Sequence, residues 1–167
     1  MRRLWAAVGS ALFLVAAPGT VAGLLPYLLT GWRSTGPPLP LVVLGALLVA
    51  GGGAVLLHAF ARFVSEGVGT PAPIAPTKEL VVGGLYRYVR NPMYVAVGAT
   101  IVGQALLLGR PGLLAYAALF WLVVAAFVHG YEEPTLSARY GERYDAYRRA
   151  VPPWLPRLTR RRPSSSA

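Results

Sequence analysis

Two polar motifs carry the residues of this sequence that could do chemistry. The first, Gly84-Leu-Tyr-Arg-Tyr-Val-Arg-Asn-Pro-Met-Tyr94, gathers arginine, asparagine and tyrosine side chains, and the second is Glu132-Glu133-Pro134. Two apolar segments joined by the turn Gly109-Arg110-Pro111-Gly112 lie between the motifs. If both segments cross a bilayer, the chain returns to the side that it left, and the motifs meet at one membrane surface. Such an arrangement favours a site where a soluble cofactor meets a lipid-borne substrate.

Asn91 and Pro92 also have a structural interpretation, as the start of a helix. Asparagine is a favoured N-cap residue, and proline is favoured at the first helical position because its missing N–H costs nothing there. This interpretation does not account for the aromatic and basic residues packed around the pair, although such residues also anchor helices at a membrane surface. The first motif is therefore consistent with either an interfacial anchor or a binding site.

The two carboxylates of the second motif need cationic partners. Glu132 and Glu133 lie at the end of the fourth apolar segment, where the helix dipole disfavours negative charge, and Pro134 is expected to end the helix. Arg87 or Arg90 across the hairpin can supply the positive charge. The resulting ion pair is either a structural clamp on the hairpin or part of a site for a cationic ligand.

The composition of the chain indicates a membrane protein. Of its 167 residues, 55% are hydrophobic and only 13% are charged, and the mean hydropathy is +0.52. An average soluble domain has about 25% charged residues. The absence of cysteine excludes disulfides and thiolate chemistry. The apolar residues form four blocks that are candidate spans: Leu4–Leu29, Leu39–Phe63, Met93–Leu108 and Leu113–Val128.

The net charge of +10 arises from basic residues at both ends of the chain and between the second and third blocks. The positive-inside rule therefore predicts that both termini and the loop Arg62–Asn91 lie in the cytoplasm, in a multi-pass protein of the cell (inner) membrane. The sequence has no aromatic and basic RNA-binding motif and no basic recognition helix, so nucleic acid is not an expected partner.

The sequence predicts an all-α, polytopic membrane protein with about four transmembrane helices and a C-terminal interfacial amphipathic helix. Residues 1–64 are expected to form two scaffold helices, and residues 65–156 hold both motifs, the hairpin and the amphipathic helix Leu136–Val151. Residues 157–167 are a basic, serine-rich tail that is expected to be disordered and to attract anionic lipid head groups. The second scaffold helix carries small residues that favour close packing, namely Ala46, Ala50 and Ala54 at four-residue spacing beside Gly51-Gly52-Gly53.

The segment from Leu80 to Tyr94, the hairpin, the second motif and the segment Tyr140–Pro152 together resemble the isoprenylcysteine carboxyl methyltransferases and related phospholipid methyltransferases. The resemblance covers roughly Ser65–Pro156, and its parts come in the family's order. It implies an enzyme in which S-adenosylmethionine binds at the cytosolic end of the hairpin and a lipid or other hydrophobic molecule accepts the methyl group. Carried over by position, the cofactor-binding residues are Lys78, Glu79, Leu80, Val81, Tyr86, Asn91, Pro92, Met93, Tyr94 and Glu132.

The chemistry of the residues agrees with much of this assignment. Glu132 suits the ammonium group or the ribose hydroxyls of the cofactor, and exposed N–H groups at the start of the third block suit its carboxylate. Arg90, Glu132 and Glu133 are the candidate catalytic residues. A carboxylate acceptor needs no base, whereas an amine acceptor must lose a proton, and Glu133 or His129 would be the nearest base.

The sequence also departs from the pattern of the family that it resembles. Asn91 stands where eukaryotic relatives have histidine, and Val128 stands where the prenylcysteine enzymes have arginine, which disfavours a prenylcysteine acceptor. Two other functions remain open: an NADPH-dependent membrane reductase related to the sterol reductases, and a non-enzymatic scaffold in which Arg90 and Glu132 form only a salt bridge. His129 and Glu132 share a helix face, but no third ligand is in register, so no metal site is predicted.

Overall fold

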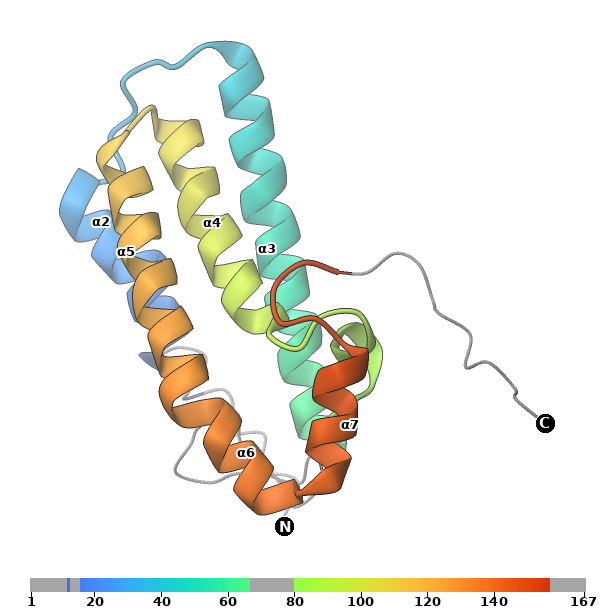
Figure 1. Cartoon of the computed structure of the whole chain (residues 1–167). Helices are drawn as coiled ribbons and strands as arrows, with labels where there is room; N and C mark the ends of the chain where they lie inside the picture. The colour runs from blue at the N-terminus through green and yellow to red at the C-terminus, as the bar shows by residue number, and fades with distance from the viewer. Residues whose placement is uncertain (1–11, 13–15, 67–79, 157–167) are drawn as a thin grey trace.

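The computed structural model describes residue 12 and residues 16–66 and 80–156, except for the side chains of residues 63–66. The elements in these ranges are all helical, which confirms the all-α prediction (Figure 1). In chain order they are η1 (Thr20–Leu24), α2 (Leu25–Thr30), α3 (Leu39–Glu66), η2 (Gly84–Arg87), α4 (Pro92–Leu108), α5 (Gly112–Phe127), η3 (Val128–Glu132), α6 (Glu133–Tyr140) and α7 (Glu142–Ala150).

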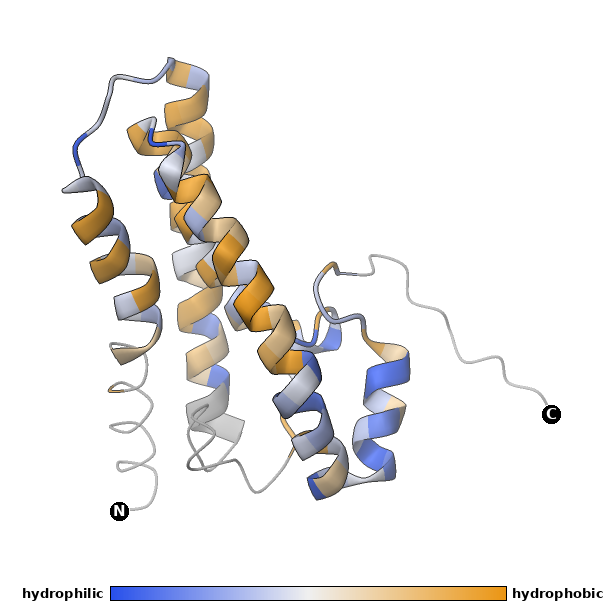
Figure 2. Cartoon of the chain, turned by 60° about the vertical axis from the view of Figure 1, so that its left-hand side comes forward, coloured by the Kyte–Doolittle hydropathy of each residue, from blue (hydrophilic) through white to orange (hydrophobic). Residues whose placement is uncertain are grey.

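Two helical runs are long and apolar enough to cross a membrane. The most apolar 18-residue stretch has a mean hydropathy of 2.3 within Leu39–Arg62 and of 2.0 within Gly112–Tyr140, whereas α4 and the run Thr20–Thr30 are apolar but shorter. Most side chains on the two long runs are exposed, such as Leu47 at 65% and Leu122 at 70%. Figure 2 shows hydrophobic residues over the long helices and hydrophilic residues on α7. Apolar surface of this extent identifies a membrane protein with helical spans.

Glycines bring α3 and α4 into close contact. A Cβ atom at Gly45 would lie 2.6 Å from the carbonyl oxygen of Gly103, and a Cβ atom at Gly52 would meet the backbone of α4 equally closely. Small residues at these positions let two helix backbones approach each other in lipid. The prediction that small residues of this helix make a close contact is confirmed for Gly52 but is wrong for the alanines, which are exposed: Ala46, Ala50 and Ala54.

Pro26 interrupts the backbone hydrogen bonding of residues 16–30, here called the N-terminal segment, which contains η1 and α2. Side chains from two other helices replace the lost bonds. Proline has no N–H, so the carbonyls of Ala22 and Val21, four and five residues earlier, lack that donor. Gln104 of α4 donates from Nε2 to the Ala22 oxygen at 2.6 Å, and the Tyr116 hydroxyl of α5 donates to the Val21 oxygen at 2.8 Å. These two bonds attach η1 and α2 to the hairpin of α4 and α5.

The helix that begins at Gly112 does not end at Pro134, so that prediction is wrong. α5 continues through the π-helical turn η3 into α6, and one helical run reaches Tyr140. At the end of η3 the Glu133 N–H donates to the Val128 carbonyl, five residues earlier. The wider turn lets the helix pass a proline that has no N–H of its own.

The predicted amphipathic helix Leu136–Val151 is instead two helices, α6 and α7, which meet at Gly141. Gly141 has φ +54° and ψ −134°, a conformation that glycine adopts far more readily than other residues. The chain reverses there, so α7 runs back toward the loop that precedes α4 (Figure 1). Tyr144 of α7 is buried against that loop.

Candidate functional site

A cavity of about 150 Å³ lies where the loop before α4, the start of α4, α5, η3 and the N-terminal segment meet. The hairpin thus brings the two polar motifs of the sequence to one cavity, since Asn91 and Glu132 both line it. Its polar wall carries Tyr86, Arg90, Asn91, Tyr94 and Glu132. The rest of its wall is apolar and is formed by Ala17, Pro18, Val21, Pro92, Met93, Val97 and Phe120.

Glu132 is the carboxylate at the cavity wall. The Tyr94 hydroxyl, near the start of α4, donates a hydrogen bond to Glu132 Oε2 at 3.2 Å and so bridges the two arms of the hairpin. Both side chains line the cavity. A carboxylate has about four lone-pair sites, so the bond from Tyr94 leaves Glu132 able to accept further bonds from the N–H or O–H groups of a ligand.

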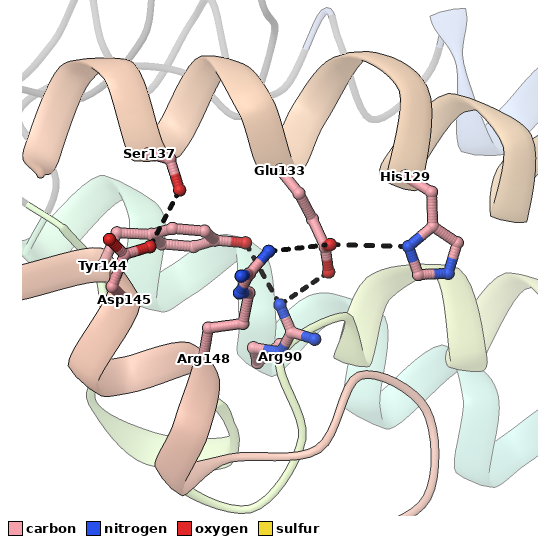
Figure 3. A network of polar contacts seen from close by, with 7 residues as sticks. All are labelled: Arg90, His129, Glu133, Ser137, Tyr144, Asp145 and Arg148. Atoms are coloured by element: carbon pink, nitrogen blue, oxygen red, sulfur yellow. Dashed lines mark hydrogen bonds and ion pairs between the residues drawn. The ribbon is translucent and has the colours of Figure 1, made fainter.

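Glu133 is adjacent to Glu132 in the sequence but has different partners (Figure 3). Its Oε1 accepts a hydrogen bond from Arg90 Nη1 at 2.7 Å, and its Oε2 lies 3.4 Å from His129 Nδ1 and 3.7 Å from Arg148 Nη1. The Arg90 and Glu133 side chains are only 9% and 10% exposed, so they form a buried ion pair. The cation predicted across the hairpin is therefore Arg90, and it pairs with Glu133 rather than with Glu132. Glu133 is not among the described residues that line the cavity.

Two buried donors at the polar wall have no hydrogen-bond partner within the described part of the chain: Asn91 Nδ2 and Arg90 Nε. Asn91 occupies the N-cap position of α4, as predicted, but its side chain makes no capping bond. The capping interpretation therefore explains where Asn91 lies and not what its amide does. Because buried polar atoms are nearly always satisfied in folded proteins, an exception calls for an explanation such as a catalytic role or a bound group. Both atoms are candidate donors to a ligand.

The chain after α7 binds the backbone of the loop that carries the first motif. The N–H groups of Arg90 and Asn91 donate to the carbonyl oxygens of Pro152 and Pro153, at 2.9 Å and 3.2 Å. These two N–H groups precede α4 and are satisfied by the backbone of the chain that follows α7. The two residues that follow Pro92 retain N–H groups that have no acceptor inside α4, because the first turn of a helix lacks one.

Tyr86 and Tyr147 connect η2 to α7 beside the cavity. The Tyr147 hydroxyl donates to the Tyr86 carbonyl oxygen at 2.7 Å. Burial raises the pKa of both phenols above the ordinary value, and the neighbouring Tyr147 phenol and Glu132 carboxylate raise that of Tyr86 further. Both phenols therefore remain protonated at physiological pH and can act as neutral donors.

The structure describes only two of the four remaining predicted cofactor residues. Lys78 and Glu79 lie outside the described residues. Leu80 is half-buried, and Val81 is buried in a cluster with Ala59 of α3 and Tyr86. Neither Leu80 nor Val81 is among the described residues that line the cavity.

Sequence reasoning missed the apolar wall that the N-terminal segment and the hairpin provide. Apolar residues within a span carry no pattern that separates a cavity wall from a surface that faces lipid. The only local signal is Pro18, since a proline inside an apolar helix marks a place where the helix is distorted. The missed residues are Ala17, Pro18, Val21, Val97 and Phe120.

Comparison with known proteins relates this site to a family. A profile of the phospholipid methyltransferase family matches residues 40–143, a range that includes both polar motifs. The chain is also 33% identical over 78 residues to a protein-S-isoprenylcysteine O-methyltransferase of Schizosaccharomyces pombe, a match that covers 46% of this chain and 33% of that protein. The matched region thus spans about a third of the length of this curated relative. No solved structure gives a significant match.

Proposed function

Because the chain belongs to the phospholipid methyltransferase family, we propose that it is an S-adenosylmethionine-dependent methyltransferase that acts on a lipid-like acceptor. The observation that carries this proposal is that Asn91 and Glu132, from separate motifs, line one cavity, and that Asn91 Nδ2 is buried without a hydrogen-bond partner among the described residues. The cavity therefore offers a donor and a carboxylate acceptor close together. S-adenosylmethionine, with its carboxylate, ammonium group and ribose hydroxyls, requires both.

The polar wall of the cavity fits this cofactor. Glu132 would accept hydrogen bonds from the ammonium group or the ribose hydroxyls, and Asn91 Nδ2 would donate to the carboxylate, together with the N–H groups at the start of α4. The faces of Tyr86 and Tyr94 would lie against the sulfonium or the adenine. The bound cofactor would supply an electrophilic methyl group for in-line transfer to a nucleophile.

The size of the described cavity supports a site for only part of the cofactor. Its volume of about 150 Å³ is below the roughly 300–1,000 Å³ of pockets that enclose a drug-sized ligand. Under this proposal, the segment that contains Lys78 and Glu79 would hold the remainder, as the family resemblance implies. Val81 would then act through its packing against Ala59 of α3 and Tyr86 and not through direct contact.

The chain itself would contribute positioning and the exclusion of water, which are the main sources of rate enhancement in such a transfer. Val21, Val97 and Phe120 close the apolar side of the cavity. Because Glu132 lines the cavity and Glu133 does not, we assign to Glu132 the acceptance of a proton from an amine acceptor. We assign to Glu133 the holding of Arg90.

The proposed acceptor is a lipid-like molecule other than a prenylcysteine. Val128, which is only 1% exposed, stands one helical turn before Glu132, where the resemblance implies an arginine for the prenylcysteine carboxylate. Arg90 does not replace that arginine fully, because its Nη1 already donates to Glu133 and to the Tyr144 hydroxyl.

We further propose four membrane crossings with the site at the cytosolic face of the cell (inner) membrane. α4 has 17 residues. At 1.5 Å per residue it would span about 26 Å, close to the roughly 30 Å core of a bilayer. Arg87, Arg90 and Arg148 all lie at the end of the hairpin that carries the site, which supports a cytosolic location through the positive-inside rule.

Cofactor binding to detergent-purified protein tests the proposed activity. Tritiated S-adenosylmethionine should bind, and Glu132→Gln should weaken binding roughly ten- to hundredfold, because a hydrogen bond to a charged group contributes about 1.5–3 kcal/mol. Glu142→Gln, at an exposed position of α7, is the matched control and should bind like the wild type. Binding of NADPH in place of S-adenosylmethionine would indicate a reductase, and binding of neither would indicate a scaffold.

Incubation with labelled cofactor and a native membrane lipid extract tests the proposed acceptor. Mass spectrometry should then identify a lipid product that is heavier by one methyl group. Methylation of a prenylcysteine in the same assay would overturn the acceptor assignment and leave the methyltransferase assignment in place.

A further inference from the structure

Residues 144–154, here called the C-terminal clamp, hold the loop that carries the first polar motif. Two of the contacts are hydrogen bonds to the loop backbone. The Tyr147 hydroxyl donates to the Tyr86 carbonyl oxygen at 2.7 Å, and the Arg90 N–H donates to the Pro152 carbonyl oxygen at 2.9 Å. A third bond joins the Asn91 N–H to the next proline carbonyl at 3.2 Å. Every loop residue held in this way lines the cavity. The clamp lies beyond residues 40–143, which match the family profile.

The far end of the clamp is itself fixed to the hairpin. The ring of Trp154 packs edge-on against the ring of Trp121 in α5, with 5.3 Å between the ring centroids and 85° between the planes. Trp121 in turn lies against Gly98 of α4, where a Cβ atom would come within 2.9 Å of the indole. Trp154 is therefore supported by α5 directly and by α4 through Trp121.

We propose that the C-terminal clamp is a positioning element for the cofactor cavity and that Tyr147 and Trp154 are its positioning residues. The inference rests on the function proposed above. The clamp contacts the backbone atoms of Tyr86 and Asn91, so it sets where their side chains enter the cavity without touching a ligand. Misplacement of a binding group by about 1 Å is enough to impair a site strongly.

A clamp that served only for packing would behave differently in experiments. Its disruption would lower the stability of the whole fold, and the affinity for the cofactor would fall only in proportion to the fraction unfolded. A positioning clamp instead affects the affinity of the folded protein and the local protection of the two amides that it binds. The two tests below measure these quantities separately.

Tyr147→Phe removes one hydroxyl donor and leaves the ring packing in place. The Kd and the KM for S-adenosylmethionine should rise about two- to tenfold, as expected for one hydrogen bond, while kcat at saturation stays within about twofold of the wild type. Tyr88→Phe, which alters an exposed phenol in the same loop, should change neither value. Unchanged Kd and KM in Tyr147→Phe, or a loss of kcat alone, would overturn the inference.

Amide hydrogen exchange measures the clamp without any ligand. In the wild type, the amides of Arg90 and Asn91 should be protected, and Trp154→Ala should speed their exchange about tenfold or more while the interior of α4 keeps its protection. Leu155→Ala, at a residue that is 80% exposed, is the matched control. Equal exchange in Trp154→Ala and the wild type would refute the clamp. A wild-type protein that does not bind tritiated S-adenosylmethionine would refute the proposed function. If the wild type binds the cofactor and both clamp variants match it in affinity and amide exchange, only the clamp is refuted.

Discussion

Replacing Glu133 by glutamine tests how strongly the buried ion pair stabilises the hairpin. Arg90 Nη1 and Glu133 Oε1 are 2.7 Å apart, and both side chains are about nine-tenths buried. Removal of one partner from such a pair leaves an uncompensated buried charge and costs about 3–5 kcal/mol. We expect Glu133→Gln to lower the free energy of unfolding by about 3 kcal/mol, at the lower end of that range, because the glutamine oxygen can still accept from Arg90.

Arg148 provides the matched control for this substitution. Its Nη1 lies 3.7 Å from Glu133 Oε2, and its side chain is 49% exposed. An ion pair of that kind contributes about 0–1 kcal/mol, so Arg148→Gln should have a correspondingly small effect. Both substitutions remove a charged partner from the same network, but the Glu133 side chain is buried and that of Arg148 is half-exposed. The difference in the free energy of unfolding therefore measures the effect of burial.

Titration with sodium dodecyl sulfate in mixed micelles, followed by far-ultraviolet circular dichroism, gives the free energy of unfolding for each variant. The double variant Arg90→Met with Glu133→Met should be more stable than either single methionine variant, because it removes both charges together. Equal losses for Glu133→Gln and Arg148→Gln would refute the argument from burial. A double variant whose loss equals the sum of the two single losses would refute the pairing itself.

Asn91→Ala should weaken S-adenosylmethionine binding about two- to tenfold and leave the free energy of unfolding unchanged or higher, because its buried Nδ2 has no hydrogen-bond partner among the described residues. A destabilised variant with normal binding of the tritiated cofactor would contradict this. Gln104→Leu should lower the free energy of unfolding by about 0.6–1.7 kcal/mol in the same detergent titration, since it removes the donor that holds the N-terminal segment. Gly45→Leu should lower it by about 1–3 kcal/mol, because the new side chain would meet the backbone of Gly103. The exposed Ala50→Leu should stay within about 0.5 kcal/mol, and equal effects of the two leucines would argue against the glycine contact.

The bounds of α3, α4 and α5 could be predicted from the sequence because length and apolar composition define a membrane span. The sides of these helices that face one another could not. A helix that is apolar all round shows no stripe, so the small residues alone had to indicate the contact face. Gly45 and Gly52 make that contact, whereas the alanine stripe of the same helix is exposed.

The meeting of the two polar motifs at one cavity followed from the hairpin, since a chain that crosses and returns brings both ends to one surface. The partners of each carboxylate did not follow. Charge alone does not distinguish Glu132 from Glu133, and the contacts that do so come from Tyr94 in α4 and from Arg90 in the loop. The clamp could not be predicted either, because its bonds end on backbone carbonyls, and every residue of a chain carries one.

The separate roles of Glu132 and Glu133 depend on the π-helical turn η3. Consecutive residues in an α-helix point about 100° apart, so the direction of each carboxylate is set by the helical register in which it stands. Trp121 of α5 packs against Gly98 of α4, and between this contact and Glu133 the turn η3 adds one residue. Without that extra residue, every side chain of α6 would be rotated by about 100° and a different one would face Arg90. Pro134 marks the position of this change in the sequence. A proline alone does not reveal whether a helix ends, bends or widens, because the packing on either side of it decides.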